Sequence, residues 1–149
     1  MAKKVVPRGA TRFRISPNRP LLMVDVEVNG LGPFNFALDT GASFCVITPD
    51  MAQAIGIALE ADQPTAIGAG GRIEAGFAKL SSFRLGSHVV RNLGAAVMPL
   101  DAVEQQLGVT IAGLIGYNFL KRFVVTLDYP GGFLRLKRHA ISRPAPAKR

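Results

Sequence analysis

Apolar and polar residues alternate along the first third of the chain. From residue 24 to residue 29, valines occupy every second position, and Asp25, Glu27 and Asn29 fill the positions between them. Successive side chains of a β-strand point to opposite faces, so this pattern places the valines on one face and the polar residues on the other. The pattern therefore predicts a half-buried strand that begins near Leu21.

Similar strand patterns, separated by turns rich in glycine and proline, recur along the rest of the chain. Glycine and proline favour turns because of their backbone conformations, and we expect the chain to reverse at these positions. The sequence thus predicts a mostly β protein. The further expected strands cover residues 34–38, a segment ending at 67, and residues 73–85, 88–98, 123–128 and 133–137.

Three short helices are expected between these strands. Residues 48–50 read Thr-Pro-Asp, which supplies an N-cap, a first-turn proline and an acid near the positive end of the helix dipole. Gly56 is expected to end that helix. Residues 101–104 fit a capping box, and Gly108 is expected to close the second helix. The third is expected at residues 117–122.

The most informative segment runs from Phe36 to Ser43 and carries a single acid, Asp39, between apolar residues. A carboxylate that apolar neighbours bury without a partner is costly. A second carboxylate that shares the proton would remove this cost. Because the chain has one such segment, we expect the partner carboxylate to come from a second copy of the chain.

The segment that begins at Asp39 resembles the active-site loop of aspartic proteases, which reads Asp-Thr-Gly followed by Ala or Ser. Three other segments, in the same order along the chain, are similar to the single-domain, retroviral-type (retropepsin-like) branch of that family. Together the four segments cover most of residues 21–137. The three are the hairpin of residues 24–38, the glycine-rich stretch 66–72, and the segment Gly113-Leu114-Ile115-Gly116 with the helix that follows it.

This resemblance implies a retropepsin-like acid-protease fold: a closed, barrel-like β lobe with a flap hairpin and short helices, which works as a homodimer. Asp39 would be the catalytic residue, one from each protomer. In the family, the hydroxyl equivalent to Thr40 bonds across to the twin loop, and Gly41 lets the loop turn sharply and substrate come close. Ala42 lacks the hydroxyl that many pepsin-like enzymes carry there. Ser43 either contacts the substrate backbone or is an ordinary loop residue.

The glycine-rich stretch stands where the family carries its flap. Backbone without large side chains can close over an extended peptide and hydrogen-bond to it. An ordinary glycine hairpin remains the alternative interpretation. The flap and substrate-binding residues expected from the resemblance are Ile67, Gly68, Ala69, Gly70 and Gly71.

Two function classes follow. The first is an aspartic endopeptidase that hydrolyses extended polypeptides with a water molecule activated by two Asp39 carboxylates, and needs no cofactor or metal. The alternative is a non-proteolytic, dimeric peptide-binding module with the same fold. The intact Asp-Thr-Gly-Ala motif favours the enzyme, because a binding module gains nothing from a buried acid pair.

The charge distribution separates the ends of the chain from its centre. The net charge is +8. Residues 1–20 and residues 134–149 each carry six basic residues and no acid, whereas the stretch between them has six basic and ten acidic residues. We therefore expect a basic arm at 1–20, a folded domain at 21–137 and a basic, proline-containing tail at 138–149. The ends are interpreted as solvated tails, with contacts to nucleic acid or to an acidic surface as the alternative.

Cys45 is the single cysteine, so no internal disulfide can form. Its place in an apolar run predicts a small buried side chain rather than a nucleophile. No apolar run approaches the roughly 20 residues of a membrane-spanning helix, and residues 1–4 do not introduce a signal peptide. A cytoplasmic location is expected unless an anchor has been removed.

Overall fold

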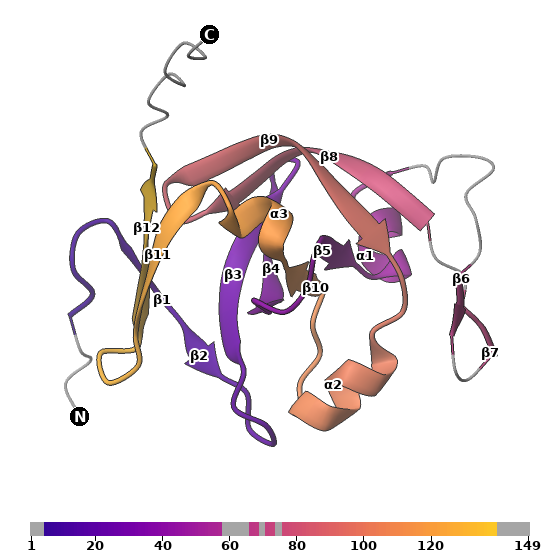
Figure 1. The fold of residues 1–149 in the computed structure, drawn as a ribbon, viewed down its shortest axis with the longest axis horizontal. Coiled ribbons are helices and arrows are strands. Elements are labelled where there is room, and N and C mark those ends of the chain that lie inside the picture. Colours follow the sequence, from indigo (N-terminus) through magenta and orange to yellow (C-terminus); the bar gives the residue numbers. More distant parts are fainter. Residues whose placement is uncertain (1–4, 58–65, 69–70, 74–75, 140–149) are drawn as a thin grey trace, which may run out of the picture.

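The computed structural model describes residues 5–57, 66–68, 71–73 and 76–139. Within them lie twelve strands and three short helices (Figure 1). The helices are α1 (Pro49–Ala54), α2 (Asp101–Leu107) and α3 (Tyr117–Leu120). The strands are β1 (Ala10–Arg12), β2 (Arg14–Ile15), β3 (Leu22–Val28), β4 (Leu31–Leu38), β5 (Cys45–Ile47), β6 (Ala66–Gly68), β7 (Gly71–Ile73), β8 (Gly76–Leu85), β9 (His88–Val97), β10 (Gly113–Ile115), β11 (Phe123–Asp128) and β12 (Phe133–Arg138).

Six strands close into a barrel in the order β3-β4-β10-β5-β9-β8, and β8 returns to pair with β3. The short strand β2 extends the same sheet by pairing with the start of β3. Closure leaves these six strands without a long free edge. The prediction of a mostly β fold with a closed lobe is confirmed.

The alternation predicted in β3 is present. Val24, Val26 and Val28 are buried in the core, whereas Asp25 and Glu27 are exposed. The two acids form surface ion pairs with arginines of neighbouring strands. Burial of each valine contributes about 1.5–3 kcal/mol, so the apolar face of this strand fixes its register in the barrel.

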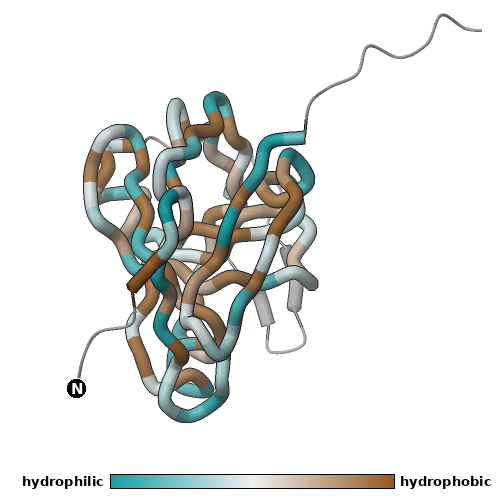
Figure 2. The backbone as a smooth tube through the Cα atoms, turned by 90° about the vertical axis from the view of Figure 1, so that its left-hand side faces the viewer, coloured by the Kyte–Doolittle hydropathy of each residue, from teal (hydrophilic) through white to brown (hydrophobic). Residues whose placement is uncertain are grey.

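A second, three-stranded sheet, in the order β1-β12-β11, packs beside the barrel. Along this side of the molecule, hydrophobic and hydrophilic segments alternate (Figure 2). The N-terminal region differs from the sequence expectation, because residues 10–12 of the expected basic arm form β1 of this sheet and residues 14–15 form β2 of the barrel sheet. Phe13 is buried there, and Arg14 bonds to Asp25 and to Asn35. Part of the N-terminal basic stretch therefore belongs to the folded domain.

The helix ends agree only in part with the sequence. Thr48 caps α1 as predicted, with its hydroxyl oxygen accepting from the Met51 N–H at 3.1 Å. Gly108 closes α2 in the left-handed conformation, also as predicted. The capping box of α2 is wrong: its N-cap is Leu100, without a side-chain cap bond, and Glu104 instead accepts from the N–H of Ile111.

The short strand β10 has apolar neighbours on both faces. Its Ile115 faces the main core inside the barrel, whereas Leu114 belongs to a smaller cluster that includes Leu107 of α2. All three residues of β10 are buried. A strand buried on both faces cannot shift without exposing apolar surface, so β10 is a rigid support for the loops at its ends.

Candidate active site

Asp39 lies where β4 ends, on a loop that leads to β5. Its N–H donates to the carbonyl of Ile115 at 3.0 Å, and one carboxylate oxygen accepts from the N–H of Gly41 at 2.9 Å. The carbonyl of Asp39 accepts from the N–H of Ala42 at 3.1 Å. Three hydrogen bonds thus hold this residue, whose side chain is partly exposed to solvent. The carboxylate is both fixed and accessible.

The sheet topology explains why the loop stands there. Strand β10 lies between β4 and β5, parallel to β4 and antiparallel to β5. Since β4 and β5 do not pair with each other, the chain must cross the end of β10 to connect them. This crossing is the loop of residues 39–44, which we call the catalytic loop after the role that the resemblance predicts for it. It places a carboxylate at the end of a buried strand.

The segment after β10 is hydrogen-bonded to the catalytic loop. The N–H of Tyr117 donates to the Ala42 carbonyl at 2.8 Å, and the N–H of Asn118 donates to the Ser43 carbonyl at 3.3 Å. Gly116 gives this segment its close approach, because a Cβ at that position would meet the carbonyl group of Phe44 and the carbonyl oxygen of Ala42. The absence of a side chain at 116 therefore allows the two segments to touch.

Gly116→Ala is accordingly expected to destabilise the fold by about 1–3 kcal/mol, because backbone atoms of the catalytic loop would have to move. Urea unfolding measures the effect. Gly94→Ala is the matched control, since a Cβ at Gly94 would meet no atom within 4 Å. Equal urea midpoints for the two variants would contradict this packing.

The five predicted loop residues, 39–43, lie together in the catalytic loop. Thr40, Gly41 and Ser43 are exposed, and Ala42 is partly buried. Gly41 is expected to allow a sharp turn of the loop. Its φ angle, however, is outside the left-handed region, so the turn does not require glycine for this reason. A Cβ there would instead lie 3.3 Å from a carboxylate oxygen of Asp39. Gly41 makes room for the bond between its own N–H and that carboxylate.

The glycine-rich stretch forms a hairpin, as predicted. Strands β6 and β7 pair antiparallel, with Ile67 opposite Arg72 and Gly68 opposite Gly71. Figure 1 shows this hairpin standing apart from the barrel. Ala69 and Gly70, the other two expected flap residues, lie outside the described residues. The flap role therefore stays a prediction.

Cys45 begins β5, immediately after the catalytic loop, and is fully buried. Burial raises the pKa of its thiol to about 11, although a hydrogen bond from the Gly116 backbone acts in the opposite direction. A thiol with so high a pKa is a poor nucleophile at neutral pH. The interpretation of Cys45 as a buried apolar residue is confirmed.

Sequence reasoning missed two features beside the catalytic loop. Phe44 and Phe77 are about half exposed and meet edge to face, with ring centroids 6.5 Å apart. Asn118 makes side-chain hydrogen bonds to Cys45 and to Gly94. One sequence signal was available for Asn118, because it is a polar residue among the apolar residues that begin the third helix.

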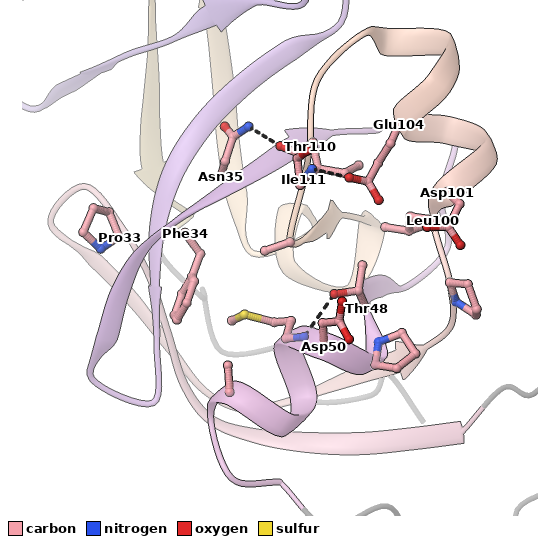
Figure 3. A pocket seen from close by; sticks show the side chains of 15 residues that line it. Pro33, Phe34, Asn35, Thr48, Asp50, Leu100, Asp101, Glu104, Thr110 and Ile111 are labelled. Carbon is pink, nitrogen blue, oxygen red and sulfur yellow. Dashed lines mark hydrogen bonds between the residues drawn. The ribbon is translucent and has the colours of Figure 1, made fainter.

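A cavity of about 550 Å³ lies near the start of β4, bordered by α1 and α2 (Figure 3). Because Asp39 follows the end of β4, the cavity and the catalytic loop lie toward opposite ends of this strand. Asn35 and Glu104, which line it, reach the segment before β10 by hydrogen bonds to Thr110 and Ile111. The cavity is therefore separate from the candidate active site.

A closed barrel that presents one Asp-Thr-Gly loop at the end of a buried strand has the retropepsin-like acid-protease fold. The family model described as "Aspartyl protease" matches residues 24–119, which is more than half of the chain. The chain therefore belongs to the aspartyl protease family. The match includes the catalytic loop and ends in α3.

Two solved structures are similar to this one. A retropepsin-like aspartic protease from Rickettsia conorii has a TM-score of 0.59 and 27% sequence identity, over 82% of this chain and 86% of the other. The retroviral protease-like domain of Ddi1 from Leishmania major has a TM-score of 0.58 and 18% identity, over 78% of this chain and 87% of the other. No curated protein sequence matches this chain significantly.

Among the residues that the structure describes, no helix combines the length and the apolar character that crossing a bilayer requires.

Proposed function

We propose that this protein is an aspartic endopeptidase that acts as a homodimer, with one Asp39 from each protomer in a two-carboxylate site. The observation that carries the proposal is the position of Asp39. Asp39 is held by three backbone hydrogen-bond partners, one of which binds its carboxylate, on a partly exposed loop at the end of a buried strand. Membership of the aspartyl protease family supports the same chemistry.

The proposed reaction needs two carboxylates that share one proton, because two close carboxylates cannot both ionise cheaply. The ionised member takes a proton from a water molecule as that water attacks the scissile carbonyl. The protonated member donates a hydrogen bond to the carbonyl oxygen and later supplies a proton to the leaving amine. Each chain has one catalytic loop, so a two-fold dimer completes the site.

The other loop residues have supporting roles in this proposal. Thr40 is exposed at the loop surface, where its hydroxyl could reach the equivalent loop of a second chain. Gly41 fixes one oxygen of Asp39 through its N–H. Ser43 is exposed where the chain leaves the loop, and in this proposal it contacts the substrate backbone. The hairpin of β6 and β7 would close over an extended polypeptide.

A digest of a diverse peptide library tests this proposal against the non-proteolytic peptide-binding alternative. We expect the wild-type protein to cleave peptides and a pepstatin-like inhibitor to block that cleavage. The alternative predicts that library peptides bind and remain intact. Binding without cleavage, at every pH from 3 to 8, would overturn the proposed function.

A further inference from the structure

The side chain of Asn118 joins two strands of the barrel where the catalytic loop ends. Its Oδ1 accepts from the N–H of Cys45 at 2.7 Å, and its Nδ2 donates to the carbonyl of Gly94 at 2.7 Å. Both distances lie at the lower end of the usual range for an N–H donor. One side-chain amide thus contacts β5 with one end and β9 with the other.

The position of this amide within the sheet is specific. Strands β5 and β9 pair in parallel from Cys45 opposite Ala95 onward. The amide stands at that first pair, between a donor of β5 and the carbonyl that precedes Ala95 on β9. The side-chain amide thus adds one further hydrogen-bonded link between β5 and β9, beyond their backbone pairing. The Cys45 N–H and the Gly94 carbonyl therefore keep hydrogen-bond partners at the point where the chain leaves the sheet for the catalytic loop.

The backbone of the same residue also contacts the loop. The N–H of Asn118 donates to the Ser43 carbonyl. The neighbouring N–H, that of Tyr117, donates to the Ala42 carbonyl. Ala42 in turn donates to the carbonyl of Asp39. Hydrogen bonds, together with the peptide link between Ala42 and Ser43, thus connect β9 through Asn118 to the residue that bears the carboxylate.

We propose that Asn118 is a positioning residue: its amide bridge between β5 and β9 fixes the exit of the catalytic loop and thereby the placement of Asp39. The inference rests on the proposed function. A misplaced carboxylate slows the chemical step more than it weakens peptide binding, because the reaction requires near-attack geometry. The bridge therefore acts on kcat rather than on KM.

The bridge needs an acceptor and a donor on one short side chain, and this requirement defines the test. Asn118→Asp keeps the acceptor, but an ionised carboxylate has no proton to donate to Gly94. Once protonated, below a pH of about 4 for an ordinary aspartate, the same side chain has one donor and one acceptor. Asn118→Leu has a similar size and neither group, so it lacks the bridge at every pH.

The experiment measures kcat and KM for one peptide substrate at several pH values from 3.5 to 6.5. Each constant of a variant is then divided by the wild-type constant at the same pH. The ratio removes the pH dependence of the wild-type reaction. We expect kcat of Asn118→Asp to fall about ten- to a hundredfold at pH 6.5 and to recover toward wild type at pH 3.5. Asn118→Leu should stay low throughout, and KM should change by less than about threefold in both variants.

Asn92→Asp is the matched control, because it makes the same chemical change at an exposed position of β9. Its kcat ratio should stay near one at all pH values. Sedimentation at assay concentration establishes that each variant is folded and as dimeric as the wild type. A wild-type kcat for both Asn118 variants, or a deficit of Asn118→Asp that does not change with pH, would overturn the positioning role.

Thermal unfolding of the same proteins separates this inference from the proposed function. The melting temperature of Asn118→Asp should approach that of wild type as the pH falls, whereas that of Asn118→Leu should not. If the wild type cleaves no peptide, the proposed function and the positioning role both fail, and recovery of the melting temperature still establishes the bridge. Without that recovery, the bridge itself is refuted.

Discussion

Asp39→Asn is expected to abolish peptide hydrolysis while leaving the fold intact. The substitution keeps the size of the side chain and an oxygen that can accept from Gly41, so the catalytic loop should retain its hydrogen bonds. An amide cannot take a proton from water at neutral or acidic pH, so the acid–base chemistry is lost. We expect the rate to fall by a factor on the order of 10⁴, measured as initial rates on one library peptide.

Circular dichroism and sedimentation of Asp39→Asn serve as controls for its fold and its association state. Asp50→Asn is the matched control variant, because Asp50 is an exposed acid of α1, away from the catalytic loop. That variant should keep the wild-type rate. Turnover by Asp39→Asn near the wild-type level would end the assignment of Asp39 as the catalytic carboxylate.

The activity per chain is expected to fall on dilution, because one chain supplies only one Asp39. Far below the dissociation constant of the dimer, the dimer concentration varies with the square of the chain concentration. A tenfold dilution should then lower the specific activity about tenfold. Rates measured over a dilution series, beside sedimentation at the same concentrations, test this relation. A specific activity that stays constant where the protein is monomeric would refute the shared site.

Much of the barrel could be predicted from local patterns. The alternation around Val24 and Val26 identified β3, and Thr48 identified the start of α1, because each signal depends on neighbours in the sequence. The catalytic loop could be predicted equally well, since an acid followed by a glycine turn between apolar runs is a local feature.

Features that depend on distant contacts could not be predicted in this way. Residues 10–15 read as a basic arm, yet they form strands because β12 and β3 offer them partners. Glu104 fitted a capping box, but its carboxylate bonds to Ile111, seven residues along the chain. The role of Asn118 depends on Gly94 and Cys45, which only the folded sheet brings together.

Mixing two kinds of chain tests most directly whether one active site is built from two protomers. Wild-type and Asp39→Asn chains, combined in equal amounts and allowed to exchange, should form about one quarter wild-type homodimers, one half mixed dimers and one quarter variant homodimers. If the site needs both carboxylates, the mixture should show about one quarter of the activity of the same total amount of wild-type dimer. Activity near one half would mean that each Asp39 works alone, and would contradict the shared-carboxylate mechanism.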